Sequence, residues 1–279
     1  MKAVSFIKLE AAGNDFIIVD APISGLIKFA KRICNRKTSI GADGVLVLEK
    51  SKRRGDPSGR PYFKMRIINA DGSEAEMCGN GVRCLGHYIV YEKKFKKKEF
   101  IIETLAGIIK IEVKGDIVSA RLSEPKDYFE NIPLDLNGRR IDVNYIDTGV
   151  PHAIVFVDRL KHIDVENIGR SIRHHKRFLP RGANANFVEQ IDSKTIEVRT
   201  YERGVENETL ACGTGSVASA IVTFLKANPS LKSEKGVTVK VIPKSHEPLF
   251  VSFDIKNRKP TNVWLKGNIK VIKKGAYNV

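Results

Sequence analysis

Two cysteines occupy the same local motif in the two halves of this chain. Cys78 and Cys212 are each followed by a glycine, a small polar residue and a second glycine, and each has a glutamate four residues before it. An amphipathic run follows both motifs, so each cysteine is expected at the start of a helix. The unpaired N–H groups and partial positive charge of a helix start can bind a carboxylate or phosphate, and they lower the pKa of a thiol. The motif therefore predicts a reactive thiol beside an anion site, twice.

A pair of thiols suits one class of reaction. Inversion of a carbon centre by proton transfer needs a base on one face and an acid on the other. A thiolate and a thiol meet that need, and they exchange roles when the reaction runs in reverse. The two helix starts would bind the carboxylate and stabilise the charge that forms as the α-proton leaves. The pattern favours a cofactor-independent racemase or epimerase of an α-amino or hydroxy acid.

Other interpretations of the motif compete with this one. A single cysteine at a helix start is more often a buried cap, and it is the duplication that favours chemistry. A phosphate-binding loop is disfavoured because neither copy ends in Gly-Lys-Ser or Gly-Lys-Thr. A redox pair stays possible, since two thiols that met would oxidise to a disulfide.

Length and composition indicate an ordinary soluble protein of about two domains. The chain has 279 residues, 42% hydrophobic and 29% charged. No apolar run reaches the ~18 residues that a transmembrane helix needs. The first eight residues are interrupted by lysine too early for a signal peptide. A cytoplasmic protein without a membrane partner is expected.

The net charge of +16 raises the alternative of a basic nucleic-acid-binding module. The basic residues are scattered, however, and the densest run, at 93–98, falls where the helix after Cys78 should end. Cations at a helix end complement its dipole and are usually solvated. No nucleic-acid-binding signature accompanies the charge, so no nucleic-acid partner is expected.

The other two cysteines, Cys34 and Cys84, fit buried small hydrophobes. The four cysteines form no C-x-x-C pair and no zinc-like spacing, so no metal site is expected. A cytosolic setting also disfavours structural disulfides.

Self-comparison indicates an internal duplication. Four segments of the first half match segments of the second in the same order, at separations of 133 to 141 residues. The matching pairs begin at 13 and 149, 41 and 182, 65 and 198, and 78 and 212. A proline-containing segment at 123–127 marks the boundary. We expect a first domain at 1–124, completed by a C-terminal strand at 268–279, and a second domain at 125–267.

Periodicity predicts mostly strands with four helices. Strands are expected near 6–9, 16–20, 45–49, 62–68, 100–104, 108–113 and 117–122, and again near 141–147, 153–158, 186–190, 195–201, 237–242, 249–254 and 262–273. Helices are expected near 24–34, 79–92, 165–174 and 213–227.

A series of motifs resembles the diaminopimelate epimerase family. The matching blocks, in family order between about residues 13 and 215, are Gly13-Asn14-Asp15-Phe16, Gly41-Ala42-Asp43-Gly44, Asn69-Ala70-Asp71-Gly72-Ser73, Cys78-Gly79-Asn80-Gly81-x-Arg83, Pro151-His152, Asn184-x-Asn186-Phe187, Glu202-Arg203-Gly204 and Glu208-Thr209-Leu210-Ala211-Cys212-Gly213-Thr214-Gly215. The resemblance implies an α+β fold of two pseudo-symmetric domains. Each would be a mostly antiparallel β-sheet wrapped around a central helix, with the active site in the cleft between them.

The resemblance also implies an activity. It is the interconversion of LL- and meso-diaminopimelate on the route to lysine and peptidoglycan, without pyridoxal phosphate or metal, by a homodimer.

Carried over residue by residue, the resemblance assigns roles. Cys78 and Cys212 would be the two acid/base thiols, and His152 and Glu202 would adjust their pKa values. The groups that bind substrate would be Asn14, Asn69, Gly79, Asn80, Asn184, Glu202, Arg203, Gly213 and Thr214. The planar fork of Arg203 suits a bidentate contact to the distant carboxylate.

Three departures from the family pattern bear on this interpretation. Val150 stands where the family usually has an asparagine, so one polar contact to substrate is missing. The loop at 205–207 is one residue longer than the common form, and 265–269 replaces a more usual Gly-Pro-Ala. The first two concern substrate binding, so a related racemase of another amino acid, such as histidine or proline, stays an alternative.

Overall fold

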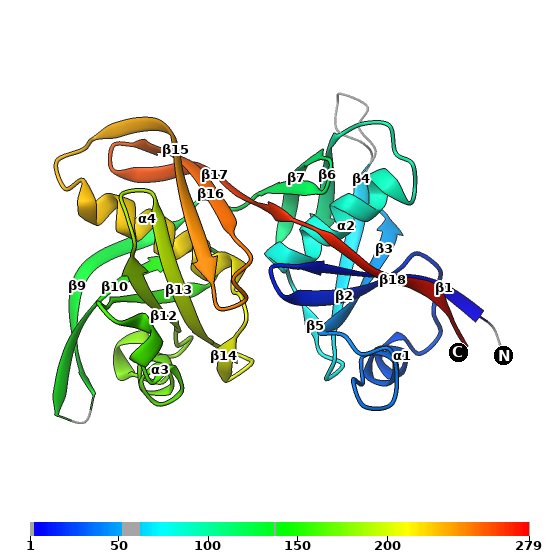
Figure 1. The fold of residues 1–279 in the computed structure, drawn as a ribbon, viewed down its shortest axis with the longest axis horizontal. Helices are drawn as coiled ribbons and strands as arrows, with labels where there is room; N and C mark the ends of the chain where they lie inside the picture. The colour runs from blue at the N-terminus through cyan, green and yellow to red at the C-terminus, as the bar shows by residue number, and fades with distance from the viewer. Residues whose placement is uncertain (1–2, 52–61, 137, 279) are drawn as a thin grey trace. The chain divides into compact units, whose positions relative to one another are not determined.

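The computed structural model describes residues 3–51, 62–136 and 138–278. The chain divides into two compact units, one of Met1–Arg121 with Gly267–Val279 and the other of Leu122–Lys266. Figure 1 shows each unit as a curved sheet with helices packed against it.

The first unit is built on a mixed, mainly antiparallel sheet. Its strands are β1 (Ala3–Ala11), β2 (Asn14–Val19), β3 (Gly44–Lys50), β4 (Tyr62–Asn69), β5 (Glu74–Ala75), β6 (Glu99–Thr104), β7 (Gly107–Lys114), β8 (Ile117–Arg121) and β18 (Lys270–Asn278). Antiparallel pairs join β18 to β1, β1 to β2, β3 to β4, β6 to β7 and β7 to β8. β2 runs parallel to β3, and β4 runs parallel to β6. The short β5 pairs with the end of β4.

Two helices cover opposite faces of this sheet, α1 (Leu26–Ile33) and α2 (Gly79–Tyr91). Side chains alternate across a strand, so Val45 and Val47 of β3 pack with α1, while Leu46 lies beside the first turn of α2. Every residue of α2 from Gly79 to Val90 is buried, as expected for a helix enclosed by its sheet. Gly86 allows this close approach, because a Cβ there would lie 2.7 Å from Ile111 of β7.

The second unit has the same plan. Its strands are β9 (Lys126–Leu136), β10 (Arg139–Asp147), β11 (Pro151–Phe156), β12 (Asn184–Gln190), β13 (Thr195–Glu202), β14 (Asn207–Thr209), β15 (Ser233–Pro243), β16 (Leu249–Lys256) and β17 (Lys259–Asn268). β9 pairs with β10 and β10 with β11 in antiparallel fashion, and β11 runs parallel to β12. β12 and β14 are antiparallel to β13, β15 runs parallel to β13, and β16 is antiparallel to β15.

The helices of the second unit are α3 (Val165–Arg173) and α4 (Gly213–Ala227), with one-turn helices η1 (Leu160–His162) and η2 (Lys176–Phe178). α4 contacts β11, β12, β15 and β16, and most of its residues are buried. α3 packs by Val165 and Ile172 on a core that includes Phe187 and Tyr201. The predicted fold class is therefore confirmed: each unit is a mostly antiparallel sheet around a central helix, and the strand connections repeat.

The sequence patterns missed three features of this plan. The boundary was predicted at 123–127, but the strand β9 begins at Lys126; it carries Pro133 and is mostly exposed, with Ile132 and Leu134 buried in the core and Leu136 packed against it. The predicted strand at 262–273 is two strands, β17 and β18, separated at the buried Ile269. The short strands β5 and β14 were not predicted at all.

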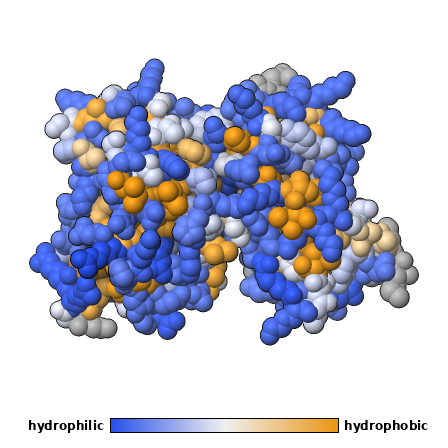
Figure 2. Space-filling model, viewed as in Figure 1, coloured by the Kyte–Doolittle hydropathy of each residue, from blue (hydrophilic) through white to orange (hydrophobic). Residues whose placement is uncertain are grey.

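Hydrophilic side chains cover most of the face shown in Figure 2, with apolar groups in scattered patches on each unit. Among the described residues, no helix has the length and apolarity to cross a membrane.

Candidate functional site

Cys78 caps the start of α2, as its motif predicted. Its backbone is extended (φ −141°, ψ 120°), and its half-buried Sγ accepts a hydrogen bond from the N–H of Gly81 at 3.4 Å. A sulfur that accepts from a helix-start N–H is stabilised as the thiolate. The next residues, Gly79 and Asn80, are buried in the first turn.

Cys212 occupies the equivalent position at the start of α4. Its backbone is again extended (φ −112°, ψ 112°), and its buried Sγ lies 3.5 Å from Oγ1 of Thr214. Thr214 is fixed in turn, because its carbonyl accepts a hydrogen bond from Thr148 at 3.2 Å. Gly215 must be glycine here: a Cβ would lie 2.4 Å from Asn186 and 3.3 Å from the Cys212 sulfur. Both cysteines thus stand at helix starts, while their catalytic role stays a prediction.

Glu202 lies beside Cys212. It ends β13, with the Thr209 hydroxyl and the Cys212 thiol near its carboxyl. Burial raises the pKa of this carboxyl above its ordinary 4.5, although these two neighbouring groups oppose the rise. A carboxyl that keeps its proton to higher pH can donate a hydrogen bond to a thiolate, so Glu202 can adjust the pKa of the Cys212 thiol.

His152 is fully buried on β11. Its Nδ1 lies 3.1 Å from the amide nitrogen of Asn186, and its Nε2 lies 3.5 Å from the amide nitrogen of Asn184. Burial lowers the pKa of the imidazole to about 3, and the negative charge of Asp147 only partly opposes this. His152 is therefore neutral at physiological pH, and it does not supply a positive charge to a thiolate.

Arg203 and Asn184 are joined at the end of β13. The N–H of Arg203 donates to Oδ1 of Asn184 at 2.7 Å, and its guanidinium donates to the carbonyl of Arg181 at 3.1 Å. Within the described ranges, no carboxylate forms an ion pair with the Arg203 guanidinium. That arrangement suits a group held ready for an anionic ligand.

Asn14 and Asn80 belong to one partly buried network of hydrogen bonds in the first unit. Asn80 donates to Oδ1 of Asn14, and Asn14 donates to Asp43 at 3.2 Å. The fully buried Arg83 donates to Oδ1 of Asn80 at 2.6 Å and to the carbonyl of Gly79 at 3.2 Å. Arg83 belongs to the motif after Cys78 but was not predicted as a site residue, and its hydrogen bonds orient the start of α2.

Asn69 stands apart from this network. It ends β4, and its side-chain amide donates to Ser73 at 3.0 Å across a turn. The structure therefore brings Asn14 and Asn80 together in the first unit, but it does not connect Asn69 to them by a hydrogen bond.

The glutamate that precedes each cysteine pairs with an arginine at the equivalent position of each unit. Glu74 forms a bidentate pair with Arg66 at 2.7 and 2.9 Å. Glu208 forms one with Arg199 at 2.6 and 2.8 Å, and it also binds Lys244 at 2.7 Å. The arginines lie on β4 and β13, and the glutamates lie on the short strands β5 and β14 that lead to the helices. Each pair thus anchors the segment that delivers a cysteine.

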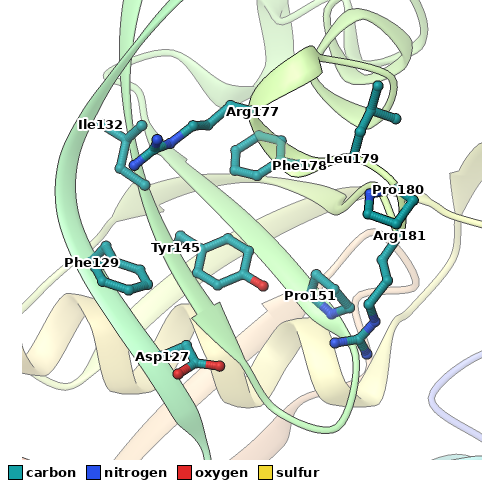
Figure 3. A pocket seen from close by; sticks show the side chains of 10 residues that line it. All are labelled: Asp127, Phe129, Ile132, Tyr145, Pro151, Arg177, Phe178, Leu179, Pro180 and Arg181. Atoms are coloured by element: carbon teal, nitrogen blue, oxygen red, sulfur yellow. The ribbon is translucent and has the colours of Figure 1, made fainter.

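The hollow shown in Figure 3 belongs to the second unit and encloses about 300 Å³. The side chains of Phe129, Tyr145 and Phe178 form its apolar wall, and Arg177 and Arg181 lie at its edge. None of the predicted site residues lines it, although Pro151 of its lining directly precedes His152. Arg181 connects it to the predicted site, because the carbonyl of Arg181 accepts a hydrogen bond from the Arg203 guanidinium.

Each cysteine caps the buried central helix of its unit, at the same point of a strand plan that repeats. Solved structures share this fold. A phenazine biosynthesis protein of the PhzF family from Bacillus anthracis superposes with a TM-score of 0.72 over 100% of both chains, at 18% identity. A hydroxyproline epimerase from Agrobacterium vitis superposes with a TM-score of 0.68 over 98% of this chain and 92% of that one, at 13% identity. At such identities the likeness concerns the fold alone.

Comparison of the sequence with known families and proteins shows the family of this chain. The model of the diaminopimelate epimerase family matches residues 6–122 and 144–242. The diaminopimelate epimerase of Aquifex aeolicus (strain VF5) is 38% identical over 98% of this chain and 97% of its own length. That of Archaeoglobus fulgidus is 41% identical over 78% of this chain and 81% of its own. The chain belongs to the diaminopimelate epimerase family and is an isomerase, so the resemblance and the enzyme class are confirmed.

Proposed function

We propose that this chain interconverts LL- and meso-diaminopimelate with Cys78 and Cys212 as its acid/base pair. Family membership supports the reaction. The observation that carries the thiol assignment is the duplication: each cysteine caps a buried central helix at the same point of a repeated strand plan.

The proposed reaction is a transfer of two protons. The thiolate of one cysteine takes the α-proton from one face of the carbon, and the thiol of the other gives its proton to the opposite face. The electron pair left by the first transfer is held by the adjacent carboxylate until the second transfer forms the new C–H bond. The reverse reaction exchanges the two roles, so each turnover leaves one thiol and one thiolate.

The N–H groups at the start of each helix would bind the substrate carboxylate. The N–H groups at Gly79, Asn80, Gly213 and Thr214 are those that a helix leaves unpaired in its first turn. Charge grows on the substrate carboxylate as the α-proton leaves, and fixed N–H donors stabilise that charge without reorganising. The hydrogen bonds of Arg83 to Gly79 and Asn80 keep the first of these turns in place.

The second amino-acid group of the substrate would be bound by polar side chains. We propose that Arg203 binds the distant carboxylate bidentately, with Asn14, Asn69, Asn184 and Glu202 holding the remaining polar groups. The absence of a carboxylate partner for Arg203 among the described residues supports this assignment. Val150 removes one polar contact that the family pattern would provide.

Three further proposals follow from the family. The enzyme acts in the cytoplasm, in the biosynthesis of lysine and peptidoglycan precursors, and it acts as a homodimer. Gel filtration with light scattering tests the homodimer directly, since a monomeric mass in the active preparation would remove that proposal.

A substrate panel tests the proposed function. The protein, dialysed against a chelator and without added pyridoxal phosphate, is incubated separately with LL-diaminopimelate, L-histidine and L-proline. Chiral chromatography then measures inversion. We expect meso-diaminopimelate from the first and no inversion of the other two. Inversion of histidine or proline without that of diaminopimelate would assign the chain to the rival racemase activity.

A further inference from the structure

Asn186 lies behind His152 and is held in one orientation. Its amide nitrogen donates to the carbonyl of Ala153 at 3.2 Å, and its Oδ1 accepts from the hydroxyl of Thr200 at 3.0 Å. A flipped amide would set its oxygen against the Ala153 carbonyl, so the amide nitrogen must face that side. The second hydrogen of the same nitrogen points to Nδ1 of His152, 3.1 Å away.

Asn184 is fixed just as firmly on the other side of the imidazole. Its Oδ1 accepts from the N–H of Arg203 at 2.7 Å, so its amide nitrogen is the atom that lies 3.5 Å from Nε2 of His152. Both ring nitrogens therefore face N–H donors. An imidazolium, which donates at both nitrogens, would have no acceptor on either side.

The two distances decide which nitrogen carries the proton. Nδ1 is close enough to Asn186 to accept a good hydrogen bond, whereas Nε2 is too far from Asn184 for more than a weak one. A proton on Nδ1 would lie close to the N–H of Asn186 and repel it. A proton on Nε2 is tolerated, because the distance from Nε2 to the Asn184 amide nitrogen is long.

Asn186 also contacts the helix that begins at Cys212. A Cβ on Gly215 would lie 2.4 Å from Oδ1 of Asn186, so the glycine backbone rests directly on this side chain. One buried amide therefore touches β11, through the Ala153 carbonyl and His152, and also the first turn of α4.

We infer that Asn186 is a positioning residue that holds His152 as the neutral tautomer with its proton on Nε2 and that seats the first turn of α4 beside Cys212. This inference rests on the proposed function for its kinetic consequence and for the substrate contact of His152. The charged groups near the imidazole are Asp147, which favours protonation, and Arg203, which opposes it. Asp147 is also paired with Arg181 at 2.7 Å, which weakens its effect on His152.

The Nε2–H of His152 faces no acceptor among the described residues. A buried N–H without an acceptor is rare, and here it indicates that the acceptor arrives with the substrate. A carboxylate of the amino acid is the group that such a neutral donor would bind. His152 thus contributes a directed N–H rather than a charge.

Nitrogen NMR tests the inference without substrate. The chain has six histidines, and a His152→Gln variant assigns the His152 signals in protein labelled with ¹⁵N in the histidine rings. We expect an unprotonated Nδ1 and a protonated Nε2 that do not change between about pH 5 and 8. A proton on Nδ1, or a titration in that range, would overturn the inference.

Two substitutions at the same position form a matched pair. Asn186→Asp replaces the donor with a carboxylate and should move a proton to Nδ1 or produce a titrating imidazolium. Asn186→Leu removes the donor without adding a charge and should give a mixture of tautomers. If the signals of Asn186→Leu match those of the parent chain, Asn186 does not set the tautomer, even should Asn186→Asp fail to fold.

Kinetics separate a positioning role from a purely structural one. For folded Asn186→Asp, kcat for diaminopimelate should fall on the order of 10²-fold, because the turn that carries Cys212 is displaced. KM should rise as well, because His152 loses the N–H that faces the substrate. Unchanged kcat would contradict the coupling to Cys212. If the parent chain shows the expected NMR signals but no epimerisation, the proposed function fails and the tautomer assignment stands.

Discussion

Replacement of Glu208 by glutamine should destabilise the second unit far more than the matching change at Glu74 destabilises the first. The two glutamates precede their cysteines by the same four residues, and each forms a bidentate pair with an arginine on the preceding long strand. The environments differ. The Glu208 side chain is 5% exposed and has Lys244 as a second partner, whereas the Glu74 side chain is 32% exposed. The exposed pair of Glu74 is therefore a matched control for the buried pair of Glu208.

The magnitudes follow from burial. Removal of one partner from a fully buried ion pair costs about 3–5 kcal/mol, because the other charge is left without compensation. Arg199 and Lys244 are 22% and 42% exposed and can be partly solvated, which reduces the cost of Glu208→Gln to about 2–3 kcal/mol. Both partners of the first pair are about a third exposed, so Glu74→Gln should cost no more than about 1 kcal/mol.

Urea unfolding measures the difference. Trp264 is the single tryptophan of the chain and belongs to the second unit, so its fluorescence reports the unfolding of that unit. With a slope of about 2 kcal/mol per molar urea, Glu208→Gln should lower the midpoint by about 1 M. Far-ultraviolet circular dichroism follows the Glu74→Gln variant. Equal shifts in the two variants, or a larger shift for Glu74→Gln, would refute the burial argument.

The effect of Glu208 should also depend on pH. Burial would raise the pKa of its carboxyl, but the hydrogen bonds from Arg199 and Lys244 outweigh burial and hold the pKa below the ordinary 4.5. A carboxyl whose pKa is lowered on folding contributes stability that is present above its unfolded pKa and is lost as the pH falls toward its folded pKa. The parent chain and Glu208→Gln should therefore converge in stability below about pH 4.5 and differ fully at pH 7. A constant difference across this range would contradict the assignment.

Three further predictions concern the reaction. Cys78→Ala and Cys212→Ala should each lower kcat for epimerisation at least about 10²-fold with unchanged circular dichroism, and near-parent turnover in either variant would remove that thiol from the mechanism. Arg203→Lys should lower kcat/KM at least about tenfold, since an ammonium cannot form the bidentate pair; an unchanged value would argue against carboxylate binding there. Glu202→Gln should remove from the pH profile of kcat/KM the limb set by a carboxyl with a pKa above 4.5, and an unaltered profile would mean that Glu202 does not influence the thiol.

The local features of the site were predictable because their signals are local. Each Cys-Gly-x-Gly motif is followed at once by an amphipathic run, so the helix start could be located from adjacent residues. Because the motif repeats, the helix start predicted in one half also predicted the helix start in the other half. The resemblance to a family added the substrate, which no spacing of residues could supply.

The partners of the motif residues were not predictable, because they lie on other strands. The sequence shows that a glutamate precedes each cysteine, but the role of this glutamate depends on Arg66 and Arg199. Each arginine lies two residues along its strand from the residue that pairs with the glutamate. The strands β5 and β14, which carry the glutamates, are only two and three residues long, too short for a pattern of alternation. Their pairing follows from the tertiary fold.

Asn186 shows the same limit. It belongs to the Asn184-x-Asn186 motif, yet its contact with His152 joins residues 34 positions apart. This contact arises from the parallel register of β11 and β12. Parallel strands need a crossover, here through α3, and their register is set by packing on both faces. The sequence contains the motif that includes Asn186, but it does not show that Asn186 contacts His152.

Isotope incorporation at early times tests the two-thiol account most directly. The protein is incubated with LL-diaminopimelate in heavy water, and mass spectrometry follows deuterium in the substrate and the product during the first few per cent of conversion. The account predicts meso product with one deuterium at the inverted carbon, while the remaining LL substrate carries none, because the base that removes the proton is not the acid that delivers the new one. Deuterium appearing equally in recovered substrate and product would indicate a single base and would contradict the account.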